Sequence, residues 1–147
     1  MTQRVIELTD FGAAENMKLR EADIPTPGPG QIVVKNKAIG LNYLDTYFRT
    51  GLYPWPNQEK IKVPGSEGVG HVHSVGADVN FLKEDDKVSY VTPVGAYAEY
   101  ALINAAHAVE IKVDVDDHDV VASTLKGLTT HYLLHLTFKL ESGMTAL

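Results

Sequence analysis

The chain has 147 residues, 44% of them hydrophobic, which suits one globular domain with its own core and excludes two full domains. Its formal net charge of -6 and its scattered Lys and Arg exclude a binder of the nucleic-acid backbone, which needs clustered basic residues. The absence of cysteine excludes disulfides and cysteine-based zinc sites, and no apolar run reaches the about 18 residues of a membrane span, so we expect a cytoplasmic protein without membrane association.

The first part of the chain is typical of short β-strands separated by turns. Residues 5–8 and 17–21 alternate apolar and polar side chains, and a Gly-containing break between them predicts two separate strands. Prolines and glycines fill residues 25–30 and predict a surface turn, with an interdomain linker as the alternative. Residues 31–39 then predict a third strand, which ends at Gly40.

A short helical segment and bent strands follow. Residues 41–49 place apolar side chains at helical spacing and predict a short helix or turn, with a Pro-rich loop over residues 51–62 behind it. Residues 65–76 alternate glycine with β-branched residues, which is typical of a bent or bulged strand at a barrel corner. A turn then leads to a strand over residues 87–91, and residues 95–103 predict another strand pair, after which the strands stop.

The pattern becomes helical from Asp116 onward. Asp116 is the expected N-cap, apolar side chains recur every three or four positions as far as Leu136, and Gly127 predicts a break or kink. The chain stops at residues 145–147, where a new apolar run begins. We expect this end to be an artificial boundary or a truncated gene.

Several motifs resemble one enzyme superfamily. Residues 64–70 read PGSEGVG, and together with residues 86–88 they resemble the core signature of medium-chain dehydrogenases and reductases. Within that superfamily, NKAIGLNYLDTYFR at residues 36–49, GLYP at residues 51–54 and LKGLT at residues 125–129 resemble the zinc-independent, ζ-crystallin-like NADPH quinone oxidoreductases. The resemblance covers essentially the whole chain.

The resemblance implies a fold and a domain organisation. It implies a mainly β domain, a GroES-like partly open β-barrel with C-terminal helices, in which residues 1–125 form the catalytic domain. Residues 126–147 are then a helix and the start of the connection to an α/β Rossmann domain. The sequence shows no strand leading into a Gly-rich turn and helix, the feature that holds a dinucleotide pyrophosphate, so we expect this chain alone to bind NADPH weakly and to be inactive.

The implied activity is hydride transfer from NADPH to a quinone by a protein that is a homodimer when full length. The resemblance places five residues at the nicotinamide end of the cofactor: Asn42, Asp45, Tyr47, Thr129 and Tyr132. Hydrogen-bond donors must polarise the substrate oxygen where no metal does so, and we expect Asn42, Tyr47 and Tyr53 to be the catalytic residues. Tyr53 or Tyr47 is the expected donor to the developing quinol oxygen.

The sequence also bears on zinc. The zinc alcohol dehydrogenases of this superfamily carry a cysteine ligand at the position of Asn42 and a histidine ligand at that of Ser66. An amide and a hydroxyl are poor zinc ligands, so we expect no metal. Glu67, which lies close behind the metal in those relatives, is expected to brace the cleft floor through backbone bonds. Asp85 stands in a turn where the family has glycine, and aspartate tolerates the left-handed backbone that such a turn requires.

Some of these residues have plainer interpretations. Asn42 also fits the cap of the helix that begins beside it, while Tyr47 and Phe48 also fit an apolar core. Tyr53 also fits a dimer contact or a packed lid.

Other patterns carry no site, and two other functions stay open. The pairs His71/His73 and His131/His135 supply too few ligands to close a metal site, and the acidic residues around Asp116 lack the calcium-loop spacing. The alternative functions are a GroES-like binding module without catalysis, and an enoyl-type reductase or ketone dehydrogenase of the same superfamily.

Overall fold

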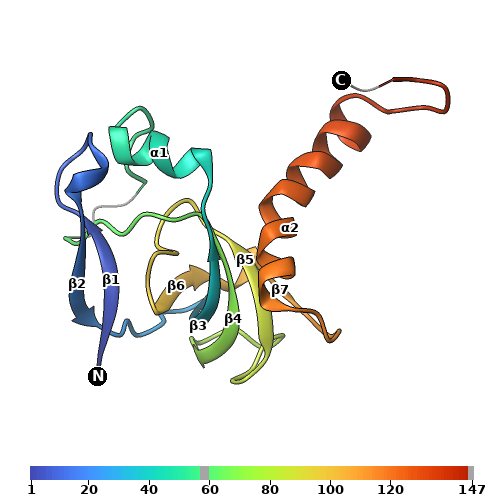
Figure 1. Ribbon diagram of the computed structural model, residues 1–147. Coiled ribbons are helices and arrows are strands. Elements are labelled where there is room, and N and C mark those ends of the chain that lie inside the picture. Colours follow the sequence, from blue (N-terminus) through green and yellow to red (C-terminus); the bar gives the residue numbers. More distant parts are fainter. Residues whose placement is uncertain (57–59, 146–147) are drawn as a thin grey trace.

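A computed structural model describes residues 1–56 and 60–145, and it shows a β-domain from which a long helix projects (Figure 1). The chain opens with an antiparallel pair, β1 (Thr2–Leu8) and β2 (Met17–Asp23), in which Thr2 lies opposite Asp23 and Leu8 opposite Met17. A single turn of 3-10 helix, Ala14–Asn16, lies between them. The two opening strands predicted from the sequence are therefore confirmed.

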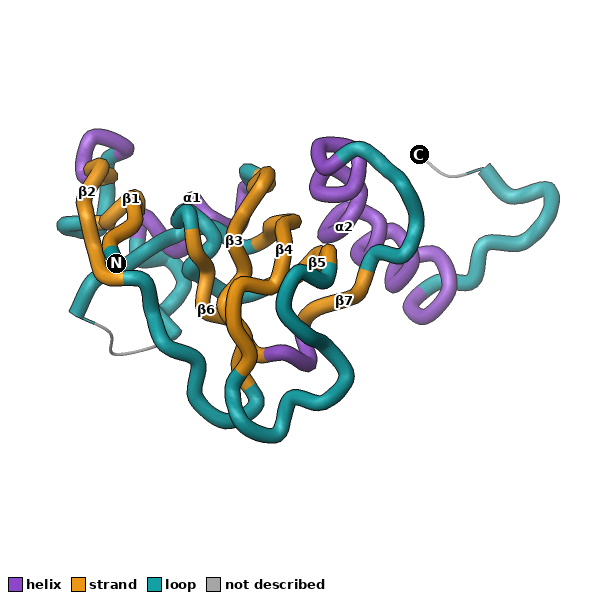
Figure 2. Tube along the Cα trace, turned by 90° about the horizontal axis from the view of Figure 1, so that it is seen from below, coloured by secondary structure: helices purple, strands orange, loops and turns teal. Residues whose placement is uncertain are grey.

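A five-stranded antiparallel sheet forms the centre of the molecule and lies between the β1–β2 pair and the long helix (Figure 2). Its strand order is β6-β3-β4-β5-β7. The strands are β3 (Gln31–Gly40), β4 (Glu67–Val75), β5 (Lys87–Val91), β6 (Tyr100–Asn104) and β7 (Ala108–Glu110). The predicted mainly β fold with a C-terminal helix is confirmed.

The central pair β3 and β4 is bent by two irregularities in its register. Val33 pairs with Ser74 but Val34 pairs with Val72, which leaves His73 unpaired, and a second shift lies between Asn36 and Ala38. Such extra residues bend a strand and increase its twist. The prediction of a bent or bulged strand over residues 65–76 is confirmed.

The core lies where these bent strands face one another. Its fully buried members include Ile32, Val34, Val72 and Val88, with Tyr90 as the largest side chain. Burial raises the pKa of the Tyr90 phenol, which donates a hydrogen bond of 2.8 Å to Oδ1 of Asn36. This apolar cluster, with its satisfied phenol, thus holds the sheet together.

Two predictions about the strands were wrong. A strand pair was expected over residues 95–103, but β6 begins only at Tyr100, because Gly95 has a φ of 107° and the Asn36 amide donates to the carbonyls of Ala96 and Ala98. The Asn36 side chain therefore holds this segment on one side, and on the other Ala98 makes only an isolated bridge with Val5 of β1. The strands were also expected to stop at this point, yet β7 follows, with three residues that are too few to show an alternating pattern.

Helix α1 (Tyr43–Thr50) confirms the predicted short helix. Asn42 is its N-cap, and Gly51 ends it with a φ of 77° in the left-handed region, which glycine adopts without strain. In the turn before β5, Asp85 has a φ of 69°, as expected for an aspartate at a glycine position. The predicted loop over residues 51–62 follows α1, and residues 57–59 of it lie outside the described part of the chain.

Helix α2 (Asp117–His131) is the long projecting helix. The Asp116 carboxylate accepts from the backbone N–H of His118 at 2.8 Å, which confirms the predicted cap. Of the expected break or kink at Gly127, the break is wrong, since a single glycine costs a helix only about 1 kcal/mol and α2 runs through it. The kink stays a prediction. Hydrogen bonding widens into a π-helix over Tyr132–Thr137.

The predicted division at residues 125 and 126 falls inside α2, and it stays a prediction. The predicted apolar ending reaches residues 146 and 147, which lie outside the described residues. No helix in the described ranges is long and apolar enough to span a membrane.

Candidate active site

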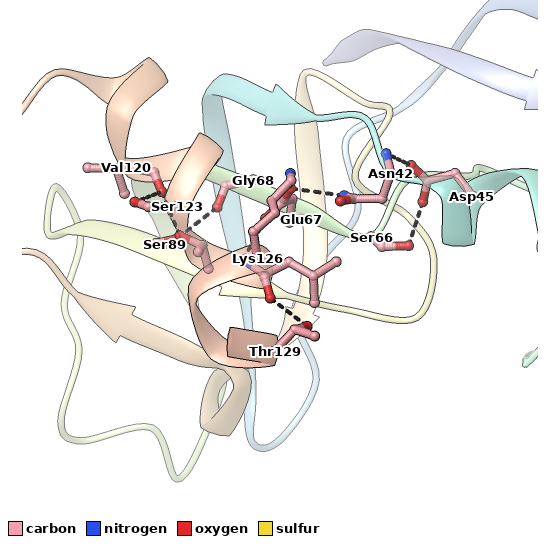
Figure 3. Close-up of polar contacts among 12 residues, drawn as sticks. Asn42, Asp45, Ser66, Glu67, Gly68, Ser89, Val120, Ser123, Lys126 and Thr129 are labelled. Atoms are coloured by element: carbon pink, nitrogen blue, oxygen red, sulfur yellow. Dashed lines mark hydrogen bonds and ion pairs between the residues drawn. The ribbon is translucent and has the colours of Figure 1, made fainter. Parts of the chain in front are cut away.

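Among the described residues, the most deeply buried charged side chain is that of Glu67, at the start of β4. It has no exposed surface, and its carboxylate accepts from Nδ2 of Asn42 at 2.9 Å, from the backbone N–H of Leu125 at 2.9 Å and from the Lys126 ammonium. Asn42 precedes α1, whereas Leu125 and Lys126 belong to α2 (Figure 3). One buried carboxylate therefore ties the two helices to the sheet.

Glycine at position 40 makes room for this carboxylate. Gly40 lies directly opposite Glu67 in the β3–β4 pair. A Cβ atom at Gly40 would lie 2.1 Å from Oε1 of Glu67, which is far inside van der Waals contact. The close approach of the β3 backbone thus fixes the place of Glu67.

A second buried carboxylate, that of Asp45 in the first turn of α1, has only neutral partners. Oδ2 accepts from the backbone N–H of Asn42 and from the phenol of Tyr97, both at 2.8 Å, and Oδ1 accepts from the Ser66 hydroxyl at 2.5 Å. Burial, reinforced by the Asp45 carboxylate, raises the pKa of the Tyr97 phenol, which therefore stays a donor. These bonds fix the start of α1 and so the Asn42 side chain.

A cavity of about 390 Å³ opens between the start of α1 and one face of α2. We call it the Asn42 cavity. Its lining residues are Asn42, Tyr43, Leu44, Leu125, Lys126, Thr129 and Thr130. The structure therefore brings together Asn42 and Thr129, two of the residues that were predicted to meet at the nicotinamide.

A larger cavity of about 890 Å³ lies on the other side of α2 and reaches from α1 to the ends of β5 and β7. We call it the apolar cavity, because most of its lining is hydrophobic, including Leu44, Phe48, Ile111 and Leu128. Its polar groups include the phenol of Tyr53 and the hydroxyls of Ser89 and Thr124, which lie 2.6 Å apart. Leu44 lines both cavities.

The other predicted site residues lie beside these cavities. Tyr47 lines neither cavity, and its ring lies between those of Tyr43 and Tyr53, with centroids at 6.0 Å and 5.4 Å. Asp45 is buried and turned towards Ser66 and Tyr97. Tyr132 is 56% exposed beyond the end of α2 and lines neither cavity. Contact of these three with a cofactor stays a prediction.

Comparison with known proteins identifies the domain. Residues 28–113 match the alcohol dehydrogenase GroES-like domain family. The chain belongs to this family. The resemblance seen in the sequence motifs is thereby confirmed.

The relatives of this GroES-like domain include quinone oxidoreductases. That of Pseudomonas aeruginosa is 41% identical over 143 residues, which are 97% of this chain and 43% of that protein. The crystal structure of a Pseudomonas syringae quinone oxidoreductase matches with a TM-score of 0.89 and 40% identity, over 96% of this chain and 43% of that one. The crystal structure of Escherichia coli quinone oxidoreductase complexed with NADPH matches with a TM-score of 0.82 and 33% identity, over 96% of this chain and 42% of that one.

The chain thus spans about 43% of the length of the first of these relatives. Sequence reasoning placed Glu67 at the floor of the cleft, but it named only backbone partners for it. It missed Lys126, because a lysine on a helix normally faces solvent. Its place between Leu125 and Gly127 in the LKGLT motif was the available signal.

At the positions where the alcohol dehydrogenases carry zinc ligands, this chain has Asn42 and Ser66, and both side chains are hydrogen-bonded to carboxylates. The Asn42 amide donates to Glu67 and the Ser66 hydroxyl donates to Asp45. Within residues 1–56 and 60–145, no group of three His, Asp or Glu side chains is placed to hold a metal ion. This donor set does not fit a catalytic zinc ion.

Proposed function

We propose that this chain is the catalytic domain of an NADPH-dependent quinone oxidoreductase, which passes a hydride from NADPH to a quinone. The observation that carries the proposal is the pair of adjoining cavities on either side of α2, one lined by polar groups and one apolar, with Leu44 in both linings. Hydride transfer requires the reacting atoms to lie about 3–3.5 Å apart, so the nicotinamide and the acceptor would have to meet at the Leu44 wall that the two cavities share.

The Asn42 cavity suits a nicotinamide. The Thr129 and Thr130 hydroxyls donate to the carbonyls of Leu125 and Lys126 at 2.9 Å and 2.8 Å, which leaves their oxygen atoms free to accept from a carboxamide. The E. coli relative was solved in complex with NADPH. In the Asn42 cavity, a bound NADPH would supply the hydride, and the residues of this chain would orient the cofactor and exclude water.

The apolar cavity suits a quinone ring. The Tyr53 phenol lines it and is our proposed donor to the oxygen that gains charge as the quinone is reduced. The other two proposed catalytic residues are Tyr47, whose ring centroid lies 5.4 Å from that of Tyr53, and Asn42, which lines the neighbouring cavity. The proposed reaction proceeds without zinc. Hydrogen bonds then replace Lewis-acid polarisation of the substrate oxygen.

The proposal also covers the rest of the protein. We assign residues 1–125 to the catalytic domain and residues 126–147 to the connection with a Rossmann domain, in a cytoplasmic homodimer. A protein that brings the chain to the length of its relatives is called the full-length protein below. By itself the 147-residue chain should bind NADPH weakly and turn over little or no quinone, because tight dinucleotide binding needs the pyrophosphate-binding turn.

The test is NADPH oxidation by the full-length protein with benzoquinones, followed by absorbance before and after chelator treatment. We expect full activity after chelation, and a loss of about 100-fold for Asn42→Ala and of a smaller factor for Tyr53→Phe, since each removes a hydrogen-bond donor. Tyr100→Phe on β6, which removes a phenol remote from both cavities, is the matched control.

Three outcomes would contradict parts of the proposal. Loss of activity on chelation would overturn the zinc-free reaction, and unchanged rates for both site variants would overturn the site. Turnover of enones or alcohols in preference to quinones would favour another reductase of the superfamily. Complete inactivity towards all three, without cofactor binding, would favour a binding module.

A further inference from the structure

Lys126 is placed between the buried Glu67 carboxylate and the Asn42 cavity. Glu67 has no exposed surface, whereas the Lys126 side chain is 49% exposed and lines the cavity. Among the ion pairs of the described residues, only Lys126 reaches Glu67. The floor of this cavity therefore carries one buried negative charge and one positive charge that compensates it.

We propose that Lys126 neutralises the charge of this floor and thereby sets the relative affinity of the site for the reduced and the oxidised nicotinamide. The proposal rests on the proposed function, and it adds a residue to which no role has been assigned. Lys126 acts through Glu67 and Asn42, so it is a positioning residue.

The geometry gives the ion pair two tasks. The Lys126 ammonium and Nδ2 of Asn42 donate to the same oxygen, Oε1 of Glu67, so the ion pair and the Asn42 amide form one unit. The Leu125 N–H holds the other oxygen at 2.9 Å. Loss of the ammonium therefore removes a positive charge and also loosens the support of the amide that faces the cofactor.

The charge matters because the two forms of the cofactor differ at the ring. An oxidised nicotinamide ring is a cation and a reduced one is neutral. A floor with a neutral ion pair favours neither form strongly. An unpaired Glu67 carboxylate would attract the oxidised ring, and an unpaired Lys126 ammonium would repel it, because charges interact strongly where water is excluded.

The experiment measures dissociation constants of the full-length protein for NADP⁺ and for NADPH by calorimetry, and reports their ratio, NADP⁺ over NADPH. Lys126→Met should lower the ratio about tenfold, equivalent to about 1.4 kcal/mol. Glu67→Gln, which keeps the shape and leaves the ammonium uncompensated, should raise it. The double variant and Lys126→Arg should stay within about twofold of the wild type. Lys18→Met, an exposed lysine on β2, is the control with the same change of charge.

The opposite signs separate this inference from a purely structural role, which would weaken binding of both forms alike. A wild-type protein that binds both forms while the ratio stays constant in all variants overturns the inference and leaves the proposed function standing. A wild-type protein that binds neither form overturns both. If Lys126→Met does not fold, as checked by circular dichroism, Glu67→Gln and the double variant decide, and an unchanged ratio in Glu67→Gln overturns the inference.

Discussion

The β-domain and the outer part of α2 are built from similar residues but differ in what surrounds them. Ile32, Val34 and Val69 in the sheet have no exposed surface, and the first turns of α2 bury Val120 and Val121 against the sheet. Further along, Tyr132 and Leu136 are 56% and 70% exposed. The first turns of α2 therefore belong to the domain core, and its later turns line the two cavities. The exposed π-helical turns beyond α2 contribute little to stability.

The largest effect should come from truncating the core. Ile32→Ala should lower the free energy of unfolding of the 147-residue chain by about 2–5 kcal/mol, because it removes buried methyl groups and leaves a cavity. Leu136→Ala makes a comparable truncation in the exposed π-helix and should change the free energy of unfolding by less than about 0.5 kcal/mol. Urea denaturation of both variants checks this, and equal losses would show that the outer turns are part of the core.

Two glycines with open space around them sharpen the comparison. Gly127 lies inside α2 and a Cβ there would meet no atom within 4 Å, so Gly127→Ala should raise the free energy of unfolding by about 0.5–1 kcal/mol. Gly95 also has open space, but its φ of 107° strains any residue with a Cβ, so Gly95→Ala should lower the free energy of unfolding by about 1–2 kcal/mol. Thermal melting of both variants measures the pair. A loss of stability in Gly127→Ala would show that the helix needs flexibility at this point.

The smallest effect concerns the edge of the β-domain, where Arg4 of β1 pairs with Glu99. Hydrogen bonds and the charge of Arg4 lower the pKa of the Glu99 carboxyl below its ordinary value of 4.5. A carboxylate with a lowered folded pKa contributes stability above pH 4.5 and loses it as the pH falls through the folded value. Glu99→Gln should therefore be slightly less stable than the wild type at neutral pH, and the two should converge in acid.

Melting temperatures between pH 2 and pH 7 would show this convergence, at low salt because both partners are exposed and screened. Glu15→Gln, an exposed carboxylate in the 3-10 turn between β1 and β2, is the matched control and should show no such convergence. A constant difference between Glu99→Gln and the wild type across the whole range would contradict the assignment.

Local patterns in the sequence predicted most of the fold. The alternation in residues 31–39, the glycines of residues 65–76 and the cap at Asp116 predict strand, bend and helix correctly, because each depends on neighbouring residues only. The misread segment 95–99 depends on distant residues, because the Asn36 amide binds the carbonyls of Ala96 and Ala98 and β1 reaches it only by an isolated bridge. Gly127 was misread for a local reason, since a single glycine costs a helix too little to interrupt α2.

The candidate site divides in the same way. The sequence motifs predicted Asn42 and Thr129 as site residues, and these two share a cavity. They also predicted Tyr53, which lines the neighbouring cavity. The ion pair between Glu67 and Lys126 joins residues far apart in sequence and needs the packed position of α2. No periodicity or spacing reports such a contact.

The close approach between Gly40 and Glu67 also constrains how this pocket can be redesigned. A single methyl group at position 40 would occupy the volume of the carboxylate, so neither position can be varied freely in a mutant library. Aspartate at position 67 would keep a Cγ, which lies 2.5 Å from the added Cβ, whereas Glu67→Ala removes it and opens the space that Gly40→Ala then fills. We therefore expect the two substitutions to be tolerated together more readily than Gly40→Ala alone, so that positions 40 and 67 can change only as a pair.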